Sequence, residues 1–162
     1  MTSKEIIRHS LDTGQLVLNT YLSDLSDAEL LVRPNEQAHH IAWQLGHLIA
    51  SEYEMLSQAG FDMPALPKGL AESSVPEAAG SDDPVRFFTK EQYQAWLAAQ
   101  RASTLGALAS LSESELHRPT PEAMQHYVTT IGALFNLVGM HQLMHAGQFI
   151  PVRRKLGKPI LI

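Results

Sequence analysis

The sequence predicts an all-α fold, a four-helix bundle with up-down-down-up topology. Apolar residues recur at the 3.6-residue period of a helix in four long segments. The second and third segments are separated by residues 60–86, which are rich in proline and glycine and show no helical period. Antiparallel neighbours need only a short link, so this length indicates a crossover between parallel helices. The alternative, a linker between two domains, is disfavoured because neither half has enough helices for a core, so residues 1–162 are expected to form one domain.

The first two helices are predicted from their capping residues and apolar faces. Thr2 and Glu5 are predicted to form a capping box at the start of the first helix. Its apolar face consists of Ile6, Ile7, Leu11, Leu18, Tyr21, Leu22 and Leu25. The second helix is expected to begin after Asn35, a favourable N-cap, and to end at Gly60.

The third and fourth helices are predicted in the same way. Thr89 and Gln92 provide a capping box for the third. The fourth is expected to begin at Thr120, which precedes a proline suited to the first helical position. Pro151, the last residue of the segment Gly147–Pro151, lacks an N–H group, and its ring crowds the carbonyl of the preceding turn. The fourth helix is therefore expected to kink or end near this segment, and Gly157 marks its final stop.

An internal similarity links the two halves of the chain. Segments 22–30 and 108–116 both contain the capping box Ser-x-x-Glu, and both are soon followed by Arg-Pro. This pattern favours two related helix–turn–helix units, one made of the first and second helices and the other of the third and fourth. The alternative is that two similar turns use similar residues.

Composition excludes several classes of function. The chain has 12 Lys and Arg against 17 Asp and Glu, a net charge of −5, which argues against a nucleic-acid partner because phosphate binding needs a basic face. It lacks an apolar run of about 18 residues and a signal-like start, so we expect a soluble cytoplasmic protein without a membrane partner. It contains no cysteine, so any reactive thiol must arrive with a ligand.

Three of the eight histidines form a candidate metal site. His141 and His145 are four residues apart, so their side chains leave one face of the fourth helix, the face that also carries its apolar residues. His47, in the apolar second helix, is the best third ligand. Three neutral imidazoles are costly to bury without partners, and a divalent metal removes that cost by accepting a lone pair from each. Three protein ligands leave an open position for water or substrate.

Histidine ligands do not select the metal, so zinc, nickel and iron remain alternatives. A second interpretation of the three histidines is that they are hydrogen-bonded core residues. Ser51, Glu54 and Gln148 are expected to lie toward the site and to position a proton or a ligand; packing or rim roles are the alternative. His40 is expected to line the mouth of the site. The remaining histidines carry no ligand prediction: His9, His39, His117 and His126.

The residues around these histidines resemble a known family. Segment 40–49, which reads HIAWQLGHLI, resembles the second-helix motif of the DinB superfamily, and segments 141–150 and 153–159 resemble its last-helix motif. The resemblance covers the whole chain. It implies a four-helix bundle, a divalent metal held by His47, His141 and His145, and a homodimer. In several branches of the family the metal works with a low-molecular-weight thiol, which makes such a thiol a candidate cosubstrate here.

These features lead to competing hypotheses of function. The first is a metal-dependent enzyme, of the thiol-dependent transferase or hydrolase type, with an unassigned small-molecule substrate. The second is a non-enzymatic metal or small-ligand binder in a stress response, and the third is a purely structural helical module. A serine hydrolase is disfavoured because the Gly-x-Ser-x-Gly elbow is absent, and the glycine-rich nucleotide motifs are absent as well.

Overall fold

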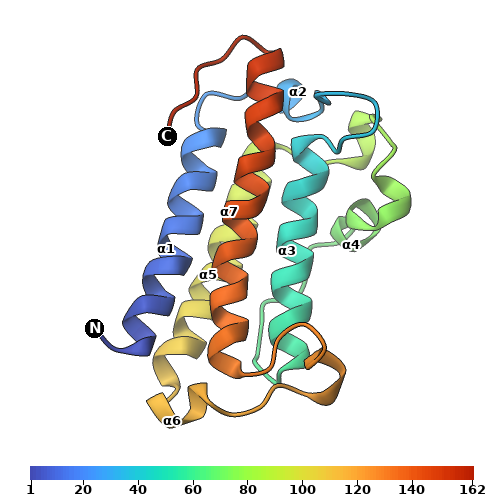
Figure 1. The fold of residues 1–162 in the computed structure, drawn as a ribbon. Helices are drawn as coiled ribbons and strands as arrows, with labels where there is room; N and C mark the ends of the chain where they lie inside the picture. The colour runs from blue at the N-terminus through green and yellow to red at the C-terminus, as the bar shows by residue number, and fades with distance from the viewer.

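The computed structural model describes residues 1–162 and confirms an all-helical four-helix bundle (Figure 1). The four long helices are α1 (Ser3–Leu22), α3 (Ile41–Gln58), α5 (Lys90–Ser110) and α7 (Ile131–Lys155). In Figure 1, α1 and α7 run in one direction and α3 and α5 in the other, which is the up-down-down-up order. No helix combines the length and the apolar composition needed to cross a membrane.

The helices form a ring in which α7 lies between α1 and α3. The pair α1–α7 has the most extensive interface, and α5 closes the ring against α1 and α3. Glycine permits close approach in this interface. A Cβ atom placed on Gly139 would lie 2.8 Å from the carbonyl carbon of Ser10, and one placed on Gly14 would lie 2.6 Å from the carbonyl oxygen of Gly139. The backbones of α1, which carries Ser10 and Gly14, and of α7, which carries Gly139, are therefore in direct contact, and this contact fixes the position of α7.

The crossover between α3 and α5 contains short helical turns that the sequence pattern did not predict. They are α4 (Leu70–Ser74), η1 (Pro76–Ala78) and η2 (Pro84–Arg86). Prolines occupy the first position of η1 and η2, where a missing N–H group costs nothing. Helix α4 packs against α3, so the crossover covers the outer side of that helix. Helix α3 ends at Gln58, and the predicted stop residue Gly60 follows two residues later with a φ of +89°.

The predicted capping boxes are present. Those at Thr2 and Thr89 begin α1 and α5, and those at Ser26 and Ser112 begin the four-residue helices α2 (Asp27–Leu30) and α6 (Glu113–Leu116). The matching positions of α2 and α6 after α1 and α5 agree with two related helix–turn–helix units. A capping box is read correctly from sequence because both of its hydrogen bonds are local.

The predicted start of the second helix after Asn35 is wrong. The Oδ1 atom of Asn35 accepts hydrogen bonds from the backbone N–H groups of Gln37 and Ala38 at 3.0 Å, so Asn35 stabilises a turn instead of a helix. Helix α3 begins at Ile41, and its N-cap is His40. The Nδ1 atom of that ring accepts a hydrogen bond from the backbone N–H of Trp43 at 3.0 Å.

The predicted start of the fourth helix at Thr120 is also wrong. The Thr120 hydroxyl donates a hydrogen bond to the carbonyl of Val128 at 2.6 Å, which closes a loop containing η3 (Glu122–Met124). Helix α7 begins after the N-cap Thr130. It continues through Pro151 to Lys155, so of the two expected outcomes near residues 147–151 the helix does not end there, and the predicted final stop at Gly157, with a φ of +69°, follows it. Pro151 has no N–H group to donate to the carbonyl of Gly147, four residues earlier. Both residues are exposed, so water can reach that carbonyl instead.

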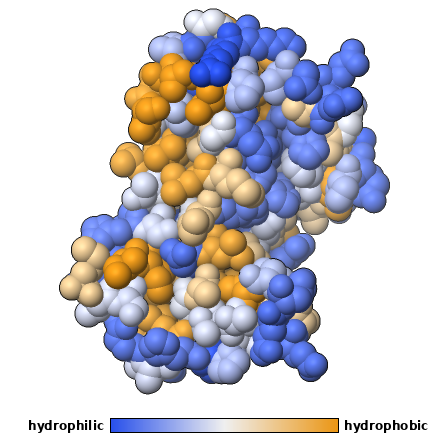
Figure 2. Space-filling view, in the orientation of Figure 1, coloured by the Kyte–Doolittle hydropathy of each residue, from blue (hydrophilic) through white to orange (hydrophobic).

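The core consists of two large hydrophobic clusters and a small third one, in which Trp43 packs against the crossover residues Ala78 and Ala79. One of the large clusters surrounds Leu45 and Phe149, and the other surrounds Leu56 and Phe135. Buried polar side chains occupy the same helices between the two large clusters: Glu52, Gln100, Arg101, Thr104 and Gln142. On the outside, Figure 2 shows hydrophobic residues gathered at the upper left and across the middle, and mainly hydrophilic residues on the right, the side of the crossover. Exposed hydrophobic residues include Met140, Met144 and the C-terminal Ile160, Leu161 and Ile162.

Candidate metal centre

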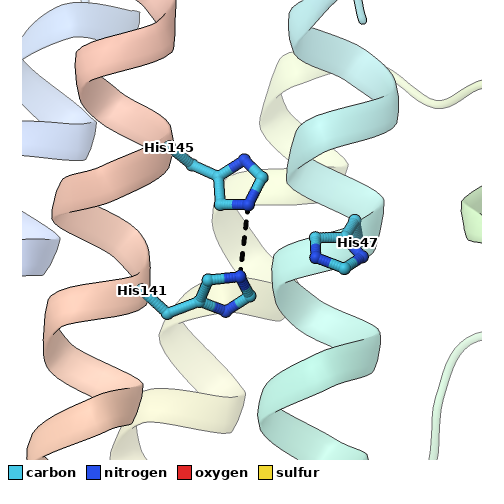
Figure 3. A group of neighbouring side chains, drawn as sticks. All are labelled: His47, His141 and His145. Atoms are coloured by element: carbon cyan, nitrogen blue, oxygen red, sulfur yellow. Dashed lines mark hydrogen bonds between the residues drawn. The ribbon is translucent and has the colours of Figure 1, made fainter.

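The three predicted histidines meet between α3 and α7 (Figure 3). One ring nitrogen of each lies within 4.8 Å of the others. The Nε2 atoms of His141 and His145 are 3.2 Å apart, and the ring centroid of His47 lies 5.2 Å from the centroids of both. The structure therefore brings together all three histidines that the sequence singled out, and each supplies a nitrogen to one point.

Helix geometry explains this convergence. His141 and His145 lie one turn apart on α7 and point to the same side, toward α3. His47 comes from α3, which runs antiparallel to α7 and contacts it directly. His145 is buried, while His47 and His141 are partly exposed. The group is thus closed toward the core and open toward solvent.

Burial keeps the three imidazoles neutral. It is the main reason why the pKa of His47 lies below its usual range, with a smaller effect from His39. Burial and the nearby His47 lower the pKa of His141 to about 4, and burial with His141 and His47 lowers that of His145 to about 3. Neutral imidazoles carry free lone pairs at neutral pH. Three of them facing one point form a donor set that suits a divalent cation.

The orientation of His47 is set by its neighbours on α3. The Trp43 ring stacks on it with an interplanar angle of 6° and a centroid distance of 5.2 Å. Ser51 lies one turn further, with its hydroxyl 3.4 and 3.5 Å from the two ring nitrogens. Trp43 is itself held by the crossover, because its indole N–H donates a hydrogen bond to the carbonyl of Val75 at 3.1 Å. The crossover therefore stabilises one wall of the site.

A cavity of about 320 Å³ adjoins the histidines. His47 and His141 form one end of it, and Ser51 and Glu54 line it as predicted. Its other walls include apolar and aromatic side chains from α3, α7 and the loop before α7: Met55, Leu137 and Tyr127. A small molecule in this cavity would contact both the histidines and a carboxylate.

Two predicted site residues lie elsewhere. Gln148 is exposed on α7 and does not line the cavity. His40 is buried as the N-cap of α3, and its Nε2 atom lies 3.0 Å from the carbonyl of Ser81, so the expectation that it lines the mouth is wrong. The expected geometry assumed that His40 belonged to the helix, whereas the helix begins after it. His39 is partly buried against Trp43, and the other histidines are exposed: His9, His117 and His126.

Sequence reasoning missed two residues of the site. Gln44 lies 2.9 Å from His145, measured from its Oε1 atom to Nδ1 of the ring. Its signal was present: a polar residue at an otherwise apolar position of the second helix, near His47. Tyr127 lines the cavity from a loop, where helical periodicity gives no information.

Comparisons with known proteins agree with this fold. The sequence model of the DinB superfamily matches residues 10–149. A conserved protein from Enterococcus faecalis is 19% identical and has a TM-score of 0.70, over 98% of this chain and 99% of that one. YfiT from Bacillus subtilis, described as a probable metal-dependent hydrolase with an unusual four-helix bundle topology, is 16% identical with a TM-score of 0.68, over 96% and 89%. No curated protein sequence matches the chain.

Proposed function

The chain belongs to the DinB superfamily, and from this premise we propose that it is a metal-dependent enzyme whose divalent ion is held by His47, His141 and His145. The observation that carries the proposal is the convergence of three neutral imidazoles at the end of a cavity. Zinc, nickel and iron all suit three imidazole ligands. When bound, such an ion supplies Lewis acidity and lowers the pKa of a coordinated water or thiol toward neutrality.

The proposed reaction is hydrolysis of a small molecule, with thiol-dependent transfer as the second version. Glu54 is the acidic residue among those that line the cavity with His47 and His141, and its carboxylate is placed to accept a proton from the nucleophile. The description of YfiT as a probable metal-dependent hydrolase supports the first version. In the second version a low-molecular-weight thiol supplies the sulfur, since the chain has no cysteine. We place the enzyme in the cytoplasm, as a homodimer.

Metal analysis tests the ligand assignment. We expect purified protein to hold one divalent ion per chain, and His47→Ala and His141→Ala to lose most of it because each removes one of three donors. A chelator should also destabilise the wild type, since an ion at 1,000 times its Kd adds about 4 kcal/mol to the free energy of unfolding. His126→Ala, a change at an exposed histidine, serves as the control. A wild type without stoichiometric metal, or variants that retain as much, would refute the assignment.

Glu54→Gln tests the proposed base. The change keeps the size of the side chain but removes its basicity, so we expect turnover to fall by about 10²–10⁴-fold with unchanged metal content. Turnover is measured on ester and amide substrates and on thiols with electrophilic acceptors. Glu91→Gln, at an exposed position of α5, is the matched control. Wild-type turnover in Glu54→Gln would exclude this role, and a metal-loaded wild type that is inactive on the whole panel would favour the non-enzymatic metal binder.

A further inference from the structure

Gln44 connects a histidine of the site to the start of α3. It is 1% exposed and lies on the second turn of that helix. Its Nε2 atom donates a hydrogen bond to the carbonyl of His39 at 3.2 Å, and its Oε1 atom lies 2.9 Å from Nδ1 of His145. A backbone carbonyl can only accept a hydrogen bond, so the amide nitrogen of Gln44 must face His39. The amide oxygen therefore faces the histidine.

This orientation determines the tautomer of His145. An amide oxygen can only accept, so the Nδ1 atom of His145 must carry the ring proton. A neutral imidazole has one N–H group, which leaves the Nε2 atom of His145 with a free lone pair. That Nε2 atom lies 3.2 Å from Nε2 of His141, on the side of the ring where the three histidines converge.

We propose that Gln44 is a positioning residue, which holds His145 in the Nδ1–H tautomer and so presents Nε2 to the metal. The proposal rests on the proposed function, because it assumes that the three histidines bind the ion. Second hydrogen bonds of this kind orient metal-binding histidines in general, and their loss typically lowers metal affinity 10- to 100-fold. Here the acceptor comes from α3 and the ligand from α7, so the contact also joins the two helices that share the site.

The start of α3 gives Gln44 a fixed anchor. The carbonyl that it contacts belongs to His39, and the next residue, His40, caps the helix and bonds to the carbonyl of Ser81 in the crossover. Trp43, in the first turn of α3, stacks on His47. One helical start therefore positions ligands on both helices, His145 through Gln44 and His47 through Trp43.

The first test compares variants of Gln44 by metal affinity, measured with zinc in competition with a chromogenic chelator. Gln44→Met has similar length but makes no hydrogen bond, and we expect it to lower affinity 10- to 100-fold. Gln44→Glu keeps an acceptor for Nδ1 of His145 but loses the donor to the His39 carbonyl, so we expect a loss of affinity clearly smaller than that of Gln44→Met. Gln148→Met, at an exposed position of α7, should have no effect. Equal losses in Gln44→Met and Gln44→Glu, or wild-type affinity in Gln44→Met, would overturn the proposal.

The second test uses the metal-free protein and so does not depend on metal binding. Nitrogen-15 NMR of the histidine rings near pH 7 distinguishes the two neutral tautomers. We expect His145 to be the Nδ1–H tautomer in the wild type and a mixture of tautomers in Gln44→Met. An Nε2–H tautomer in the wild type would overturn the proposal. If the tautomer is as expected but zinc does not bind, the proposed function fails while the effect of Gln44 on His145 is supported.

Discussion

Replacing Arg101 by methionine is expected to destabilise the protein by about 3–5 kcal/mol, a large part of the stability of a domain of this size. Arg101 is 1% exposed, and its guanidinium donates a hydrogen bond to Glu52 at 3.2 Å in the middle of the bundle. The variant leaves the Glu52 carboxylate buried, with only the hydroxyl of Thr104 as a hydrogen-bond donor at 2.6 Å. Chemical denaturation measures the loss of free energy directly.

The double variant Glu52→Leu/Arg101→Met separates the cost of an unpaired charge from the value of the pair. Burial raises the pKa of Glu52 and lowers that of Arg101, although each partner opposes the effect on the other. The Nε and Nη1 atoms of Arg101 also lack hydrogen-bond partners. The hydrogen bonds of the pair therefore offset little of the cost of burying its two charges. We expect replacement of both residues by apolar ones to give a protein more stable than Arg101→Met alone.

The pH dependence of Arg101→Met follows from the same cause. A carboxyl group whose folded pKa is raised favours the folded state when protonated, and this contribution is lost as the pH rises through that pKa. Without the attraction of Arg101, the pKa of Glu52 should rise further. The destabilisation should then be smaller at pH 4 than at pH 8. Arg8→Met, which breaks an exposed ion pair with Asp12, should change stability by only about 0.5 kcal/mol.

A loss below about 1 kcal/mol in Arg101→Met would contradict the prediction, because removing one partner of a buried pair leaves the other charge uncompensated. Equal stability of the single and double variants would contradict the prediction that Glu52→Leu/Arg101→Met is more stable than Arg101→Met. That result would mean that the unpaired Glu52 carboxylate is not the source of the cost.

The fold was predictable where the signals are local. Helical periodicity located the four helices, and the capping boxes at Thr2 and Thr89 located two of their starts. The other two starts depend on distant contacts. His40 caps α3 while its ring reaches Ser81 of the crossover, and Thr120 is used in a loop closed by Val128. Both Asn35 and Thr120 are good caps in isolation, so the sequence could not show that tertiary contacts place the helix starts elsewhere.

The site was predictable to the same extent. His141 and His145 follow from their spacing, and His47 from its place in an apolar helix, because two packed helices bring such faces together. Gln44 contacts a histidine that is 101 residues away in sequence, and no periodicity encodes that register. Gln148 was expected near the site because it shares a side of α7 with the histidines, but the cavity extends from His141 toward Leu137, in the opposite direction along the helix, and Gln148 is exposed.

Gly139→Ala should separate α1 from α7 and weaken the metal site as well. Its new Cβ atom would lie 2.8 Å from the carbonyl carbon and the hydroxyl of Ser10 and 2.9 Å from the backbone nitrogen of Leu11, and backbone atoms cannot move aside alone. Overpacking of this kind typically costs about 1–3 kcal/mol. The helix propensity of alanine, worth about 1 kcal/mol, offsets only part of that cost.

Gly147→Ala is the matched control on the same helix, because a Cβ atom there meets nothing within 4 Å, and it should stabilise the protein by up to about 1 kcal/mol. His141 lies two residues after Gly139, so a displaced α7 shifts both of its histidines relative to His47 on α3. Zinc affinity should therefore fall in Gly139→Ala and stay unchanged in Gly147→Ala. If Gly139→Ala were as stable as Gly147→Ala, close contact between α1 and α7 would not be what holds α7 in place. If Gly139→Ala lost stability but kept its zinc affinity, the spacing of α3 and α7 would be set by their own contacts, such as the hydrogen bond that His145 donates to Gln44.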